Sequence, residues 1–268
     1  SYVAGKEGAA NITFTTSNPL PSDGHVIIEF PSNFTSVAST GALASGMNGG
    51  FNVWVGASGY TAHVGRDGTG TEVKARETVT VTLVDGIKNQ KFQGLSSPFP
   101  VVKTTLSDID VSIDESSLDY YSSDRPEAVW FTPGAFVEPP TIKLQSYAAG
   151  FHGGVNISFR TSNPVPSDGH VIVQFPSEFT SVNSTAAIAS GMDGGFSVSV
   201  DSDGYTVDVQ RDGTGTDVQS GANVTVTIVN GVKNQEFEGK SGVFLKVKTT
   251  LANTGVSIDE ASSDYHDV

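Results

Sequence analysis

The chain of 268 residues contains no cysteine, few basic residues and no long hydrophobic run. Without cysteine it can form neither a disulfide nor a thiolate metal site. With 15 Lys and Arg against 29 Asp and Glu, the net charge of −14 argues against a basic face, so we expect no nucleic-acid partner. No segment approaches the roughly 18 apolar residues of a membrane-spanning helix, so we expect no membrane insertion. The hydrophobic share of 37 % still suffices for a folded core at this length.

What the chain does contain is an internal repeat. Residues 1–123 align without a gap with residues 146–268 at a constant offset of 145, and 75 of the 123 pairs are identical. The sequence therefore predicts two homologous domains, at residues 1–123 and 141–268, joined by a connector over residues 124–140. Tandem copies of this kind are typical of proteins that extend in one direction by adding units.

Alternating apolar residues predict β-strands throughout each copy. In the segment Thr78–Leu83, Val79, Val81 and Leu83 occupy one face and threonines the other. Turn signals such as Asn48-Gly-Gly and Asp67-Gly separate about seven runs of this kind in each copy. No long segment has a helical period. This spacing favours an antiparallel β-sandwich in each copy.

The strand spacing and the duplicated Ser-Asn-Pro-x-Pro-Ser-Asp-Gly and Lys-Thr-Thr segments support a family resemblance. Each copy resembles an immunoglobulin-like β-sandwich of the tandem kind found in secreted or cell-surface fibre-forming glycoproteins and adhesins. The cysteine pair of antibody domains is absent, and Trp54 has Ser199 as its counterpart. The resemblance implies an all-β fold of two tandem immunoglobulin-like domains joined by an apolar connector, and an extracellular or cell-surface location. In such families domains stack end to end, and some fibres complete one subunit with a strand from its neighbour.

The connector is too apolar for a flexible linker. An exposed cluster of its apolar side chains would mark an interaction site, so we predict an assembly interface there. The predicted interface residues are Val129, Trp130, Phe131, Phe136 and Val137. Alternatively, the aromatic residues pack at the joint between the two domains. The following segment, Thr141–Gln145, alternates and predicts a first strand of the second copy, with Ile142 and Leu144 facing inward.

The first copy has no equivalent lead-in before Ser1. Two explanations are open. The chain is a window from a longer array, or neighbouring subunits complete each other by strand addition, which would cover an open sheet edge near residues 1–8.

Five Asn-x-Ser/Thr sequons predict N-linked glycans if the protein is secreted. They are Asn11, Asn33, Asn156, Asn183 and Asn223. Asn11 and Asn156 share one repeat position on the outward face of a predicted strand. A solvated polar sheet face would favour the same residue types without glycans.

No pattern predicts catalysis, a cofactor or a metal site. Only His25 and His170 match between the copies, and each opens a predicted strand after a turn, which favours a structural role. No nucleophile elbow is present, and we expect the protein not to be an enzyme. Five carboxylates of the second copy could bind Ca²⁺, but the first copy lacks most of them, so a solvated strand face is the preferred interpretation. These residues are Asp201, Asp203, Asp208, Asp212 and Asp217.

The first functional hypothesis is a non-enzymatic structural subunit of an extracellular glycoprotein fibre or filament. It would assemble head to tail with itself through strand pairing or aromatic docking. The alternative is a carbohydrate-binding adhesin module, with the matched residues Tyr60 and Tyr205 as contacts for a polysaccharide. A third hypothesis is a non-catalytic accessory region of a larger secreted enzyme.

Overall fold

The computed structural model describes residues 1–96, 101–107, 111–116, 130–179, 181–239, 242, 244, 246–252 and 255–262. Within these residues every regular element is a β-strand, so the expected all-β class is confirmed. The chain divides into two compact units. Unit 1 comprises Ser1–Gln90 and Leu95–Phe131, and unit 2 comprises Lys91–Gly94 and Thr132–Val268.

Unit 1 contains two antiparallel sheets. In the first, β1 (Glu7–Thr15) pairs with β7 (Thr78–Lys88), which also pairs with β3 (Ser36–Val37) and β4 (Gly41–Ser45). In the second, the strand order is β10 (Ser112–Glu115), β9 (Val101–Thr105), β2 (His25–Glu29), β6 (Thr61–Arg66) and β5 (Phe51–Val55). A separate two-stranded sheet pairs β8 (Gly94–Leu95) with β11 (Trp130–Phe131).

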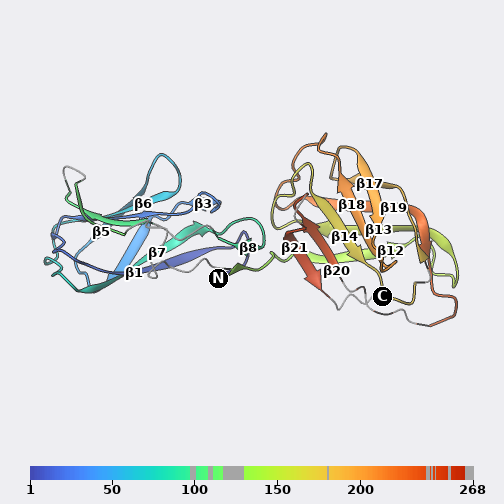
Figure 1. Ribbon diagram of the computed structural model, residues 1–268, viewed down its shortest axis with the longest axis horizontal. Coiled ribbons are helices and arrows are strands. Elements are labelled where there is room, and N and C mark those ends of the chain that lie inside the picture. The colour runs from blue at the N-terminus through green and yellow to red at the C-terminus, as the bar shows by residue number, and fades with distance from the viewer. Residues whose placement is uncertain are drawn as a thin grey trace. The chain divides into compact units, whose positions relative to one another are not determined.

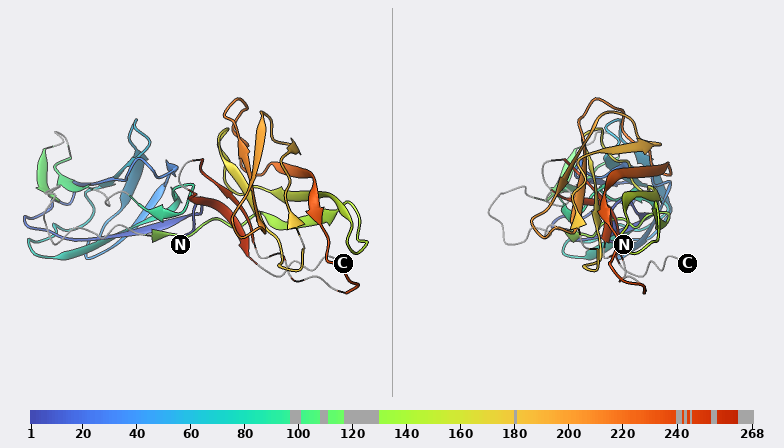
Figure 2. Two further views of the ribbon diagram at one scale, coloured as in Figure 1. Left: turned by 45° about the vertical axis from the view of Figure 1, so that its right-hand side comes forward. Right: turned by 90° about the vertical axis from the view of Figure 1, so that its right-hand side faces the viewer.

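Unit 2 repeats this plan with one more strand in its first sheet (Figures 1 and 2). That sheet runs β12 (Glu138–Leu144), β13 (His152–Arg160) and β19 (Asn223–Lys233), and β19 also pairs with β15 (Ser181–Val182) and β16 (Ala187–Ser190). The second sheet runs β17 (Phe196–Val200), β18 (Thr206–Arg211), β14 (His170–Gln174), β20 (Lys246–Thr250) and β21 (Ser257–Ser262).

The alternation in the sequence produces one core in each unit. In β7, Val79, Val81 and Leu83 are fully buried, while the side chains between them are more exposed. They share a cluster with Val26 of β2 and Val64 of β6, which belong to the other sheet. Each unit is therefore a β-sandwich, because apolar faces of two sheets meet in a single core.

A glycine allows an irregularity in the longest strand of each sandwich. Asp85 and Gly86 of β7 both have positive φ, at 61° and 71°. A Cβ at Gly86 would lie 2.5 Å from the carbonyl carbon of Ala38, so a larger residue does not fit. Asn230 and Gly231 repeat this conformation in β19. At this point the register of β1 on β7 shifts, and on the opposite side of β7 the partner changes from β4 to β3.

Candidate assembly surfaces

The end of the connector and the strand residues that follow it complete the sandwich of unit 2. Strand β12 pairs antiparallel with β13, and the register places Ile142 opposite Ile157 and Leu144 opposite Val155. The side chain of Ile142 is buried in the core, and Leu144 packs against it. The first sheet of unit 2 therefore gains an edge strand from the segment that lies between the two copies in the sequence.

The residues just before β12 cover the second sheet as well. Gly134 forms a parallel bridge with Asp259 of β21. The N–H of Gly134 donates to the carbonyl of Ile258 at 2.8 Å, and the N–H of Glu260 donates to the carbonyl of Gly134 at 2.8 Å. A Cβ on Gly134 would lie 2.5 Å from Oδ1 of Asp259, so glycine is required for this close approach. Phe136 follows into the core and contacts Phe159, with ring centroids 5.1 Å apart. The connector thus lies along an edge of both sheets.

The corresponding edges of unit 1 carry no such segment in the described part of the chain. There β1 and β10 end their sheets. Phe14 and Ile113 are only half-buried, whereas their counterparts Phe159 and Ile258 are buried. Identical residues are therefore less covered in unit 1 than in unit 2 within the described part of the chain.

One carboxylate shows what the connector changes. In unit 1, Asp114 accepts hydrogen bonds from the backbone N–H groups of Ser17 and Asn18, at 3.0 and 3.2 Å, and from the Asn18 side chain at 2.8 Å. Asp259 makes the same three contacts in unit 2, but it is fully buried beneath Gly134. Burial raises the pKa of the Asp259 carboxyl above its ordinary value, and the three donors oppose that rise.

The apolar connector residues do not form one patch. Phe131 is buried in the core of unit 1 and contacts Phe34 edge-on, with centroids 6.0 Å apart. Phe136 lies in the core of unit 2. Trp130 and Val137 are about half exposed. Val129, the fifth predicted interface residue, lies outside the described residues.

An aromatic residue on a matched loop has different surroundings in the two copies. Phe92 of Lys91–Gly94 packs against the core of unit 2, and the N–H of Gln93 donates to the carbonyl of Ser257 at 2.8 Å. The counterpart of Phe92 is Phe237, whose side chain is 70 % exposed. Sequence reasoning missed this pair, because an identical residue at a repeat position gives no sign of different burial.

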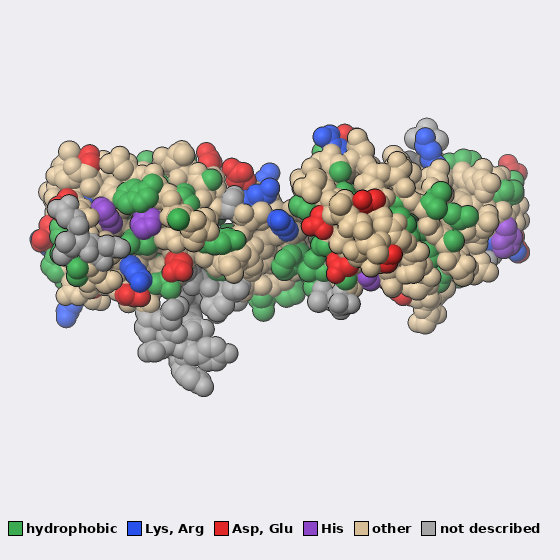
Figure 3. Space-filling view, turned by 90° about the horizontal axis from the view of Figure 1, so that it is seen from above, with side chains coloured by type: hydrophobic (Ala, Val, Ile, Leu, Met, Phe, Trp, Pro, Cys, Tyr) green, Lys and Arg blue, Asp and Glu red, His purple; other side chains and the backbone are tan. Residues whose placement is uncertain are grey.

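A second feature that sequence reasoning missed is an aromatic platform on unit 1, defined here as Trp54, His63 and His25. The indole is 42 % exposed and stacks on His63 with centroids 5.1 Å apart and an angle of 8°. It lies over Gly65, where a Cβ would come within 2.9 Å of the ring. Figure 3 shows hydrophobic and histidine side chains side by side on this unit. The available signal was that Trp54, His63 and Gly65 have no identical counterparts in the second copy.

The same positions of unit 2 hold a polar network. Nδ1 of His170 lies 3.0 Å from Oδ1 of Asp208, and Gln210 donates to the other oxygen of that carboxylate at 3.0 Å. Ser199 replaces the tryptophan. The two copies therefore present chemically different faces on equivalent strands.

The remaining predicted contact residues lie on the surface but are not gathered into one site. Tyr60 and Tyr205 are half-buried at the equivalent β5–β6 and β17–β18 hairpins. Asn11, Asn156, Asn183 and Asn223 are exposed. Asn33 is half-buried, and its side-chain amide donates to Gln90 at 2.6 Å.

Two of the five acidic residues considered as calcium ligands, Asp203 and Asp212, stabilise separate turns. Asp203 accepts hydrogen bonds from Tyr205 and Thr206, and Asp212 from Gly195 and Thr214. These donors hold the pKa of both carboxyls below the ordinary value. Among the described residues, no three histidine or acidic side chains are placed to share a metal ion.

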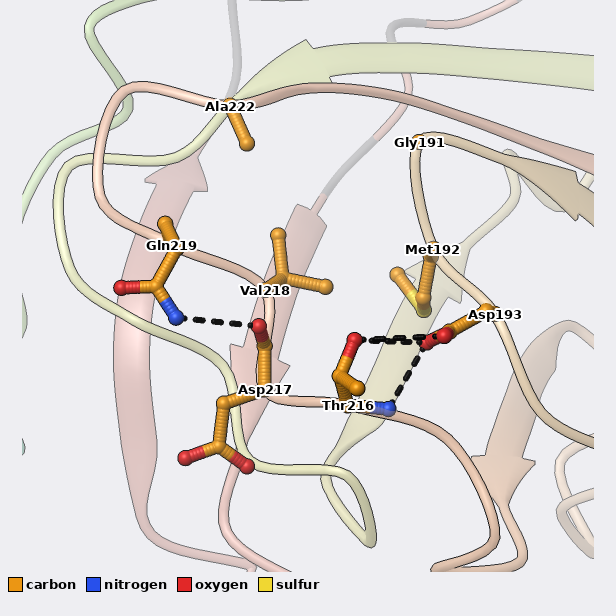
Figure 4. A pocket seen from close by; sticks show the side chains of 8 residues that line it. All are labelled: Gly191, Met192, Asp193, Thr216, Asp217, Val218, Gln219 and Ala222. Atoms are coloured by element: carbon orange, nitrogen blue, oxygen red, sulfur yellow. Dashed lines mark hydrogen bonds between the residues drawn. The ribbon is translucent and has the colours of Figure 1, made fainter.

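The surface pocket of Figure 4 is lined by Met192, Asp193 and Thr216, among others. Asp193 and Thr216 point toward each other, and the Thr216 N–H donates to Asp193 at 2.8 Å. Arg211 also contacts the Asp193 carboxylate, at 3.3 Å. A pocket at the equivalent position of unit 1 is lined by Met47, Asn48 and Thr71. Because its polar groups bond to one another, we assign this pocket a structural role.

Comparison with known proteins gives little. No protein family model matches the chain, and no characterised protein matches it. One similar solved structure is the C-terminal domain of the Streptococcus pyogenes antigen I/II-family protein AspA, with 11 % identity over 98 % of this chain and 94 % of that chain. Its TM-score of 0.30 is too low to support an inference about fold or function. No helix among the described residues is long and apolar enough to cross a membrane.

The paired carboxylates give a matched test of the connector. We expect Asp259→Ala to lower the free energy of unfolding by about 2–3 kcal/mol, because it leaves buried N–H groups without acceptors. Asp114→Ala is expected to cost about 1 kcal/mol or less, since water can reach the same groups in unit 1. Urea unfolding followed by circular dichroism measures both, and equal losses would contradict the difference in covering.

Proposed function

We propose that this chain is a non-enzymatic structural module of an extracellular glycoprotein fibre, built from repeats added end to end. The observation that carries the proposal is the position of residues 132–144. They lie between the copies in the sequence, yet they supply an edge strand to one sheet of unit 2 and a β-bridge to the edge of the other. A repeat whose sheets are completed by the segment that precedes it suits a tandem array. Each repeat added to the chain then comes with the edge strand that completes it.

The strand order supports an immunoglobulin-like sandwich as the repeating unit. In unit 2, the order β12-β13-β19-β16 corresponds to strands A, B, E and D, and β14-β20-β21 corresponds to C, F and G. The hairpin β17–β18 is an addition beside strand C. In unit 1, β1-β7-β4 corresponds to B, E and D, with the position of strand A open. We infer tandem domains of this type, in which no described strand of unit 1 occupies the A position.

The surface chemistry is consistent with an extracellular fibre. Four of the five sequon asparagines are exposed, and Asn11 and Asn156 occupy equivalent strand positions. Glycans there would shield the outer sheet face, and the net charge of −14 would oppose non-specific association. The proposal therefore includes N-linked glycans on these residues, no cofactor and no catalytic group.

Electron microscopy of the protein isolated from its source tests the fibre. We expect regular filaments, whereas isolated particles of one chain at every concentration would contradict the proposal. Ile142→Asp provides a variant: it places a carboxylate in the core of unit 2, so filaments should be lost. The matched control is Ile188→Asp, whose side chain is exposed on unit 2 and lies outside the predicted interface, so filaments should stay intact.

A second function, carbohydrate binding, is favoured by the aromatic platform. An exposed indole held flat on a sheet offers a face on which the apolar side of a sugar ring can stack. Tyr60 and Tyr205 are less exposed than Trp54, so the platform is the better candidate contact. In this function the chain would be an adhesin module that binds a polysaccharide through unit 1.

Intrinsic fluorescence tests the carbohydrate function, because the chain has only two tryptophans. In the Trp130→Phe variant, Trp54 is the sole reporter, and a bound polysaccharide should change its emission saturably. Trp54→Ala should weaken binding on a glycan array about tenfold or more, since the stacking face is lost. Leu43→Ala, at an exposed position of the other sheet, is the matched control. Undiminished binding by Trp54→Ala would exclude the platform.

A further inference from the structure

We propose that the loop carrying Phe237 docks onto unit 1 of a second copy of this chain, beside Ser112 of β10. This inference rests on the proposed fibre function and assigns its contact between chains. The model for the contact is already present in unit 2, where the equivalent loop segment Lys91–Gly94 is seated beside Ser257 of β21.

The seated loop defines the contact. Phe92 packs against the hydrophobic core of unit 2 and is partly buried there. The next residue, Gln93, donates its N–H to the carbonyl of Ser257 at 2.8 Å. One aromatic side chain and one backbone hydrogen bond therefore hold this loop on the end of the β21 strand.

The loop that carries Phe237 is anchored at its base in the same way as the loop that carries Phe92. The N–H of Gly150 donates to the backbone carbonyl of Gln235 at 2.7 Å. The N–H of Gly5 makes the equivalent bond to the carbonyl of Gln90 at the base of the first loop. The side chain of Asn234 donates to the carbonyls of Ser146 and Ala148, at 2.8 and 2.9 Å, and Asn89 makes the equivalent contacts in the first copy.

The two loops also share their glycine conformation, with φ of 132° at Gly94 and 153° at Gly239. Gln235 closes the second loop by donating to the carbonyl of Gly239 at 2.6 Å. The exposed Phe237 is thus presented on a preformed loop, which reduces the entropy lost on binding.

Unit 1 offers the matching acceptor. Ser112 is the counterpart of Ser257, and Ile113 is the counterpart of Ile258. Ser257 and Ile258 are buried in unit 2, whereas Ser112 is exposed and Ile113 is half-buried in unit 1. Val111, beside them, is 47 % exposed. The residues that receive the first loop in unit 2 are therefore accessible at the equivalent place.

The occupant is a second copy because one chain carries both halves of the contact. The donor loop and the acceptor edge are different surfaces, so the contact is heterologous, and heterologous contacts propagate into open filaments unless the rotation closes a ring. A contact made by one loop is small, so we expect association that depends strongly on concentration.

Because the chain has no native cysteine, introduced thiols are the only thiols that a cross-linker can join. The variant E238C with S112C places thiols at the counterparts of Gln93 and Ser257. A short bismaleimide should give a ladder of dimers, trimers and longer chains on a denaturing gel, with peptides 238 and 112 joined. The reference variant Q93C with S257C should cross-link within one chain. The control E238C with S58C, whose Ser58 is exposed on the β5–β6 turn, should give no ladder.

Other linkages would overturn the proposal. A 238–238 link would mean a symmetric dimer, an intrachain 238–112 link would mean that the loop folds back on its own unit 1, and no link would mean that the loops do not meet that edge. Phe237→Ser should raise the concentration for half-association about tenfold or more. Ile188→Ser, an equally exposed control in unit 2, should leave it unchanged. Filaments that persist while E238C/S112C fails to link would refute this contact and leave the fibre function standing.

Discussion

The edge of a β-sheet constrains this protein more than any other feature. Backbone N–H and C=O groups along an edge strand need partners, and an apolar edge also needs covering. Unit 2 meets both needs with the connector: β12 pairs with β13, and Gly134 bridges to β21. In unit 1 the corresponding edges are open in the described part of the chain. The edges of the repeat are therefore covered in unit 2, whereas no described segment pairs with the corresponding edges in unit 1.

Context, rather than residue identity, determines what the matched residues do. Asp114 and Asp259 accept the same three hydrogen bonds, but only the second is buried, so burial raises the pKa of one carboxyl through desolvation. Phe92 and Phe237 sit on loops with the same anchoring contacts, but only Phe92 packs against a core. Each pair differs in the chain that lies next to it. A duplicated sequence can thus leave an aromatic side chain exposed at one position and packed against a core at the other.

The sequence was sufficient for the class of fold, because alternation reports directly on which side chains face a core. Val79, Val81 and Leu83 are buried as the pattern predicts, and Ile142 enters the core from the strand expected at residues 141–145. The pattern could not assign Phe131 and Phe136 to different cores, since periodicity does not say which core receives a side chain. Nor could it place Trp54 on His63, because that contact joins two strands across a turn.

Native-state amide hydrogen exchange tests the central claim most directly, by comparing β1 with β13. Amides of β13 that face β12 should be strongly protected, while their counterparts in β1 should exchange much faster. The alternate amides, which face β7 and β19, should be protected in both strands and serve as an internal reference. Equal protection of the outward-facing amides in β1 and β13 would contradict the account, because it would mean that the edge of unit 1 is already covered.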